Sequence, residues 1–160
     1  MYTPLPPSLL PPLYLAFNVA VGGDSGKVHS TVKERWAARE PGLVAGMQAL
    51  AALADEARSA LERGDAAGLA ALMRRNFALR RRLYGDGVVG AGNIAMIEHA
   101  EAALGLSCKF TGSGGALLCA RSDGRGWLSA EDEARAVAEF AARDFELVRV
   151  CPALDTYRYD

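Results

Sequence analysis

The stretch that most constrains the fold is Lys109–Ala116, KFTGSGGA, because three glycines and a serine occupy four successive positions in it. Glycine reaches positive φ without steric cost, so the chain can bend sharply here. Apolar runs lie on both sides, Leu104–Cys108 before the glycines and Ala116–Ala120 after them. Two short apolar runs around a glycine turn predict the two strands of a hairpin.

The glycine stretch has two interpretations. In the first, successive backbone N–H groups turn to one side and form a nest, which binds an anion, most often a phosphate. In the second, the glycines only permit a tight bend between two strands. The spacing of the residues fits both.

A single domain with a hydrophobic core is expected from 160 residues of which 51% are hydrophobic. The net charge of -1 gives no electrostatic case for a nucleic acid or an anionic membrane surface. No apolar run approaches the roughly 20 residues of a membrane span. The start, MYTPLPPSLLPP, has neither the basic beginning nor the apolar core of a signal peptide. These features predict a cytoplasmic protein without nucleic-acid or membrane partners.

The three cysteines, Cys108, Cys119 and Cys151, are odd in number, widely spaced and set in apolar runs. A disulfide framework uses an even number of cysteines, and a zinc site uses closely spaced pairs. We therefore expect buried free thiols in a reducing compartment.

Hydrophobic spacing, glycines and prolines divide the chain into elements. A proline-rich lead-in covers residues 1–12, a domain covers 13–151 and a tail covers 152–160. Within the domain we first expect a strand at Leu13–Val21, a helix after Asp24, a helix opened by Pro41 and closed by Gly64, and a helix capped by Asp65. A turn at Gly85–Gly87 and a helix ended by Gly105 follow. The last part is expected to hold strands at Ser107–Phe110 and Ala116–Arg121, a helix with a capping box at Ser129–Asp132, and a strand at Phe145–Cys151.

The order of these elements is that of two βαβ-like halves. It predicts an α+β fold, a ferredoxin-like split βαβ sheet with a multi-helix insertion in the first half. On the last helix, the spacing of the small and apolar residues predicts an inward face made of Ala134, Val137, Ala138 and Ala141.

Two polar side chains interrupt the apolar stripe of the helix capped by Asp65. Asn76 and Arg80 lie one turn apart, between Met73 and Leu83. A polar group is costly to bury unpaired, so each of the two needs a partner. That partner is either a ligand or a neighbouring carboxylate or helix end.

Gly26–Lys27 follows a predicted strand and a glycine turn, which invites comparison with a phosphate-binding P-loop. The pattern fails, because Val21 stands where the first glycine belongs and Val28 where the Ser or Thr belongs. A helix that begins here still favours an anion, with Lys27 and His29 as direct contacts. The alternative is that both are solvated side chains of the first turn.

The glycine stretch resembles the third conserved motif of the GHMP small-molecule kinases. That motif reads Lys, any residue, Thr or Ser, Gly, a small residue, Gly, Gly. Three further stretches, YTPLPPSLLPPLYL, DSGKVHSTVKERW and MRRNFALRRRLYGD, are similar to the plant-type glucuronokinases within this family. The four stretches run over nearly the whole chain, which thus resembles the C-terminal half of a GHMP-family sugar kinase.

The resemblance implies a fold, cofactors and site residues. The fold is the GHMP kinase C-terminal domain, the cofactors are ATP and Mg²⁺, and the substrate is a glucuronate-like sugar acid phosphorylated at its anomeric hydroxyl. On the nucleotide side, the resemblance implies Thr111, Gly112, Ser113, Gly114 and Gly115. On the sugar side, it implies Lys27, His29, Ser30, Asn76 and Arg80.

Two parts of the family's apparatus have no match in the sequence, the ATP-phosphate loop and the catalytic aspartate of the N-terminal domain. That loop reads Pro, three residues, Gly, Leu, a small residue, Ser, Ser, whereas Gly105–Ser107 is followed by Cys108 and has Glu101 at the proline position. Phosphoryl transfer depends on positioning and on charge stabilisation around the γ-phosphate. We therefore expect a domain that is inactive without an N-terminal kinase half. The alternative is a non-catalytic interaction module derived from that domain, with an exposed apolar surface.

Overall fold

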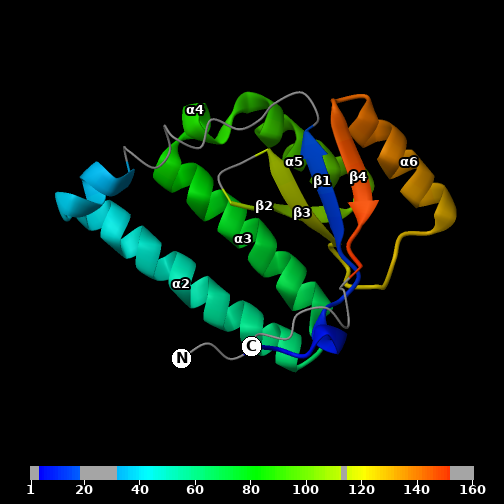
Figure 1. The fold of residues 1–160 in the computed structure, drawn as a ribbon, viewed down its shortest axis with the longest axis horizontal. Coiled ribbons are helices and arrows are strands. Elements are labelled where there is room, and N and C mark those ends of the chain that lie inside the picture. Colours follow the sequence, from blue (N-terminus) through cyan, green and yellow to red (C-terminus); the bar gives the residue numbers. More distant parts are fainter. Residues whose placement is uncertain (1–3, 19–31, 113–114, 152–160) are drawn as a thin grey trace, which may run out of the picture.

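Four strands form one antiparallel sheet in the computed structural model, which describes residues 4–18, 32–112 and 115–151. The strands are β1 (Tyr14–Asn18), β2 (Leu106–Phe110), β3 (Ala116–Arg121) and β4 (Phe145–Arg149), in the order β2-β3-β1-β4 (Figure 1). β1 and β2 run parallel with β3 between them, and β3 and β4 run parallel with β1 between them. This interleaving is the predicted split βαβ sheet.

The helices inserted between β1 and β2 confirm the predicted multi-helix insertion. They are α2 (Pro41–Glu62), α3 (Ala66–Tyr84), α4 (Asp86–Val89) and α5 (Ala91–Leu104). Outside the insertion, α6 (Ala130–Ala141) connects β3 to β4, and η1 (Pro7–Leu9) is a 3-10 turn in the lead-in. Residues 32–37 are also helical. Two predicted caps are confirmed, because Asp65 accepts a hydrogen bond from the Gly68 N–H at 2.8 Å and Ser129 accepts one from the Asp132 N–H at 3.1 Å.

One face of the sheet packs against α5 and α6 and forms the main core. Successive strand residues point to opposite faces, so every second side chain enters this core. Tyr14, Leu117 and Phe145 pack there with Ile97 of α5 and Phe140 of α6. Each fully buried side chain of this size contributes about 1.5–3 kcal/mol. The core therefore fixes where the β2–β3 hairpin lies.

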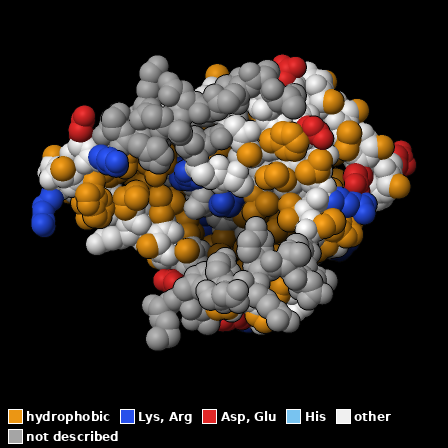
Figure 2. Space-filling view, in the orientation of Figure 1, with side chains coloured by type: hydrophobic (Ala, Val, Ile, Leu, Met, Phe, Trp, Pro, Cys, Tyr) orange, Lys and Arg blue, Asp and Glu red, His pale blue; other side chains and the backbone are white. Residues whose placement is uncertain are grey.

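The opposite face of the sheet is only partly covered. α3 lies over β2 and β3, and its Met73 packs against Leu118 and Ala120. α2 packs along α3 on the side away from the sheet (Figure 1). Next to this covered part, Leu15 is half-buried and its register partner Val148 is exposed. Figure 2 shows hydrophobic side chains gathered around a hollow in the middle of this face.

The structure corrects two local predictions. The turn predicted at Gly85–Gly87 is instead the start of the one-turn helix α4, which Gly85 separates from α3 with φ +81°. The predicted inward face of α6 is wrong, since Ala136 and Phe140 are the buried residues. Phe140 has far more apolar area to bury than any alanine, so it decides which side of the helix meets the core. The side chains predicted to point inward are all exposed: Ala134, Val137, Ala138 and Ala141.

The predicted burial of the cysteines is confirmed for Cys108 and Cys119 and wrong for Cys151. Cys108 and Cys119 are free and buried, whereas Cys151 is exposed. Cys151 lies beyond the end of β4, which ends at Arg149 and not at Cys151 as predicted. Within the described residues, no helix combines the length and the apolar character that crossing a membrane requires.

An acid titration tests the turn that leads from β3 to α6. The Asp123 carboxylate accepts hydrogen bonds from the Arg121 guanidinium at 2.6 Å and from the Arg125 N–H at 3.0 Å, and these hold the pKa of Asp123 at about 2, below its ordinary 3.8. A lowered native pKa stabilises the fold above the unfolded value, and that stability is lost as the pH falls. We expect Asp123→Asn to lower the thermal midpoint at pH 7, and the difference from wild type to shrink as the pH falls from about 4 towards 2 and to vanish below about pH 2.

The control for this titration is Asp55→Asn, on the exposed side of α2. The Asp55 carboxylate makes no hydrogen bond within the described part of the chain. We expect this variant to leave the thermal midpoint at pH 7 unchanged. A constant difference between Asp123→Asn and wild type from pH 7 to pH 2 would contradict the assigned role of Asp123.

Candidate functional site at the glycine hairpin

The glycine stretch closes the β2–β3 hairpin, as predicted. The Thr111 N–H and hydroxyl both donate to the Ala116 carbonyl, at 3.0 and 3.2 Å, and the Asn18 N–H donates to the Gly115 carbonyl at 2.9 Å. Gly112 has φ +61°, and a Cβ added there would meet nothing within 4 Å. Gly112 is therefore required by the backbone conformation and not by a lack of space.

Arg80 of α3 attaches the helix to this hairpin. Its guanidinium donates to the Gly112 carbonyl at 2.5 Å and, more weakly, to the Phe110 carbonyl at 3.5 Å. The same group lies 5.7 Å from the ring centre of Tyr84 and 5.9 Å from that of Phe110, within the range of cation–π attraction. The partner that the sequence required for Arg80 is thus a pair of backbone carbonyls, neither a carboxylate nor a helix end.

Lys109 is a second cation at this end of the sheet. Its ammonium donates to the Phe110 carbonyl at 2.8 Å. Burial, and to a smaller extent the charge of Arg80, lowers the pKa of Lys109. In the described part of the chain, neither Lys109 nor Arg80 has a carboxylate within 4.0 Å. Sequence reasoning did not select Lys109, although it is the first residue of the glycine motif.

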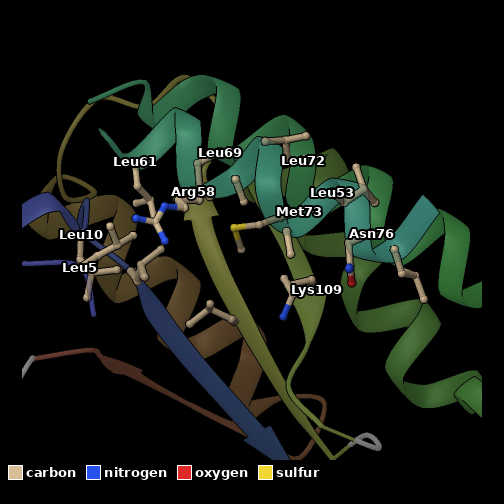
Figure 3. A pocket seen from close by; sticks show the side chains of 15 residues that line it. Leu5, Leu10, Leu53, Arg58, Leu61, Leu69, Leu72, Met73, Asn76 and Lys109 are labelled. Atoms are coloured by element: carbon tan, nitrogen blue, oxygen red, sulfur yellow. The ribbon is translucent and has the colours of Figure 1, made fainter. Parts of the chain in front are cut away.

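Asn76 faces a groove between α2, α3 and the partly covered face of the sheet (Figure 3). The groove has a volume of about 420 Å³, and Lys109 also lines it. The Asn76 Oδ1 atom is buried and has no hydrogen-bond partner within the described residues. Most of the other lining residues are apolar, among them Leu53, Leu69, Leu72 and Met73.

One side of α2 forms a wall of this groove. Leu50, Ala54, Ala57 and Leu61 line it, and Ala54 is exposed. Leu53 is buried and also lines the groove, whereas the other buried positions of α2, Leu43, Gly46 and Ala60, do not line it. Leu50 lines the groove and also packs against the buried leucines of α2 and α3.

The arrangement suits an anionic, hydroxyl-bearing ligand. Two cations without carboxylate partners attract a negative group, and the Asn76 oxygen can accept a hydrogen bond from a ligand O–H or N–H. A phosphate or a carboxylate could also receive donors from the guanidinium that the two loop carbonyls do not use. Among the described residues, no three His, Cys, Asp or Glu side chains cluster as metal ligands.

The structure describes half of the predicted site residues. Arg80 and Gly112 are in direct contact, Thr111 and Gly115 close the hairpin, and Asn76 lies in the groove with Lys109. The roles in nucleotide and sugar binding remain predictions. The other five predicted residues lie outside the described part of the chain: Lys27, His29, Ser30, Ser113 and Gly114.

Solved structures define the class of fold. The chain is similar to L. major mevalonate kinase in complex with R-mevalonate, with a TM-score of 0.66 and 18% identity over 91% of this chain and 44% of that one. It is also similar to the Lin0012 protein from Listeria innocua, with a TM-score of 0.67 and 14% identity over 87% of this chain and 38% of that one. The α+β sheet with its helical insertion thus has the fold of a GHMP-type kinase C-terminal domain.

Comparison of the amino-acid sequence with known proteins finds similar glucuronokinases. The chain is 39% identical over 151 residues to Glucuronokinase 1 of Arabidopsis thaliana, covering 94% of this chain and 41% of the relative. It is 47% identical over 118 residues to probable glucuronokinase 2 of the same plant, covering 74% and 32%. No family model matches the chain. The resemblance to the C-terminal region of a GHMP-type sugar kinase, close to the glucuronokinases, is confirmed, and the chain spans less than half the length of these relatives.

Proposed function

We propose that the chain is the C-terminal domain of an ATP-dependent sugar 1-kinase that transfers the γ-phosphoryl group of ATP to the anomeric hydroxyl of glucuronate. The identity with two glucuronokinases over most of the chain carries this proposal. The chemistry of the hairpin end supports it, because both substrates are anions. Arg80 and Lys109 are cations with no carboxylate partner within the described residues.

In this proposal each described residue has a separate task. Gly112 and Gly115 shape the loop on the nucleotide side, and Arg80 fixes that loop to α3. Arg80 also offers its remaining N–H groups to the uronate carboxylate, and Asn76 accepts a hydrogen bond from a ring hydroxyl. The other half of the predicted set, which includes Lys27 and Ser113, lies outside the described residues and is assigned to the same two sides of the site by resemblance alone.

The domain needs a partner domain for catalysis. Phosphoryl transfer requires Mg²⁺ to neutralise charge on the ATP phosphates, and a base that orients the acceptor hydroxyl. The described residues fit the anions and offer no cluster of carboxylates for the metal. We propose that the ATP-phosphate loop, the catalytic aspartate and the Mg²⁺ ligands come from an N-terminal kinase half.

Reconstitution of that kinase is the direct test. We define the chimeric kinase as Arabidopsis Glucuronokinase 1 in which this chain replaces the region it matches. We expect the chain alone to form no glucuronate 1-phosphate from ATP, and the chimeric kinase to form it at a rate at least about 10³-fold above the background without enzyme, because positioning and γ-phosphate stabilisation are then restored. Product formation is followed by ³¹P NMR.

Two results would overturn the proposal. Saturable turnover by the chain alone would show that it holds a complete active site. A folded chimeric kinase that binds ATP but phosphorylates no sugar acid would remove the assignment of this domain to sugar phosphorylation.

The second candidate is a non-catalytic interaction module. The observation that favours it is the uncovered apolar surface formed by the groove and by the neighbouring Leu15 and Val148. Exposed apolar surfaces of this kind drive association. Light scattering separates the candidates, since a chain that remains a monomer at high concentration argues against such a module.

A further inference from the structure

Cys108 and Cys119 face each other across the β2–β3 hairpin. They are register partners, one in each strand, and both side chains are buried in the main core. The sulfur atoms lie 2.9 Å apart. The two residues are separated by 11 positions along the chain, and the whole glycine loop lies between them.

The hydrogen-bond pattern of the hairpin shows which kind of pair they form. In an antiparallel ladder, hydrogen-bonded and non-hydrogen-bonded pairs alternate. Gly105 and Ser122 are hydrogen-bonded at one end of the hairpin, through the Ser122 N–H and the Gly105 carbonyl, as are Thr111 and Ala116 at the other. Counting from either end makes Cys108 and Cys119 a non-hydrogen-bonded pair.

A non-hydrogen-bonded pair suits a direct covalent link. Its Cα atoms are about 4.5 Å apart, compared with about 5.5 Å in the hydrogen-bonded kind. Disulfides span Cα separations of about 4.4–6.8 Å. The bond can therefore form without a shift in strand register.

We propose that Cys108 and Cys119 form a cross-strand disulfide, with glutathione disulfide as the oxidant, while the chain folds. One cysteine thiolate attacks a sulfur of glutathione disulfide, and one glutathione leaves as the thiolate. The second cysteine then attacks the cysteine sulfur of this mixed disulfide and releases the second glutathione. Two protein thiols are oxidised, one glutathione disulfide is reduced to two thiols, and the two cysteine protons pass to the departing thiolates or to water.

Burial decides when this exchange takes place. Thiol–disulfide exchange needs a thiolate, and burial raises the pKa of the Cys108 thiol well above its usual range. In the folded chain both sulfurs are also screened from solvent. Formation is therefore fast before the hairpin is packed, and both formation and reduction are slow afterwards.

The cross-strand disulfide acts on the edge of the sheet and has no part in the phosphorylation of a sugar. β2 is the edge strand in the order β2-β3-β1-β4. A covalent link to β3 holds this edge strand in register and joins the two ends of the segment that carries Lys109 and the glycine loop. The dithiol and disulfide forms then differ in how readily the hairpin opens.

The test uses the full chain with Cys151→Ser, which removes the exposed thiol. The chain is unfolded in urea with reductant and refolded in buffers of reduced and oxidised glutathione, and its free thiols are alkylated in denaturant and counted by mass. We expect no alkylated cysteine after oxidative refolding, and two after refolding with reductant. The thermal midpoint of the oxidised form should be about 5–10 °C higher.

Two further measurements keep the test decisive. At equal glutathione ratio, oxidation of the pair should be roughly 10–100-fold more favourable in native buffer than in urea, because the fold supplies the proximity. In the Cys119→Ala variant, the rise in thermal midpoint should disappear. The proposal is overturned if both thiols remain alkylatable after oxidative refolding of a folded chain, or if oxidation is equally favourable in urea.

Discussion

In the chimeric kinase, Arg80→Lys is expected to lower kcat/KM for glucuronate about 100-fold, while activity on a neutral sugar such as galactose falls by less than about tenfold. A guanidinium presents a planar pair of donors to a carboxylate, and an ammonium cannot reproduce that geometry. The uronate carboxylate is the group that separates the two sugars. A 100-fold change corresponds to about 2.7 kcal/mol of transition-state stabilisation, within the range for a charged hydrogen-bonded pair.

Arg82→Lys in the same helix is the matched control. Arg82 is exposed and makes no hydrogen bond within the described residues. We expect it to leave both activities unchanged. The measurement is steady-state kinetics on both sugars, together with the thermal midpoint of each variant.

A different outcome would reassign Arg80. Its hydrogen bonds to the Gly112 and Phe110 carbonyls already give it a structural task. If Arg80→Lys lowers both activities by the same factor, the guanidinium holds the glycine loop in place and does not bind the uronate carboxylate. The sugar selectivity would then have to come from Lys109 or from residues outside the described part of the chain.

Gly124→Ala is expected to lower the free energy of unfolding by about 3 kcal/mol, which corresponds to roughly 10 °C in thermal midpoint. Gly124 has φ +70°, a conformation that costs a residue with a Cβ about 1–2 kcal/mol. The added Cβ would also lie 2.6 Å from the backbone N of Ala67, at the start of α3. A backbone atom has no alternative rotamer, so the turn or the helix must move.

Gly126→Ala separates the two causes. Gly126 has φ +58° in the same turn, but a Cβ there would meet nothing within 4 Å. It should cost only the conformational part, about 1 kcal/mol. Urea unfolding followed by circular dichroism gives both values, and equal losses in the two variants would contradict a tight contact between this turn and α3.

The fold was predictable where the signal is local. The glycines between two apolar runs predicted the β2–β3 hairpin, and the Asp65 and Ser129 caps marked the starts of α3 and α6. These features depend on residues a few positions apart. Which face of α6 is buried depends instead on the large side chain of Phe140. The spacing of Val137 and the nearby alanines indicated a different face, which is exposed.

The site was predictable only in part, because its contacts join distant segments. The sequence showed that Asn76 and Arg80 interrupt an apolar stripe and need partners. It did not show that Arg80 reaches the carbonyl of Gly112, 32 positions away. It also gave no reason to place Lys109 beside Arg80, since that proximity follows from α3 crossing over β2.

The central position of β1 has a consequence for biosynthesis. β1 precedes every helix of the insertion, yet its partners are β3 and β4, so Tyr14 pairs with Cys119 and Arg149. At about 5–20 residues per second, a ribosome needs on the order of 10 s to make the chain between β1 and β4. During that time α2 and α3 can already pair, because they are neighbours in sequence. β1 meanwhile has neither of its sheet partners, so its apolar side chains wait without the strands that flank them in the folded chain.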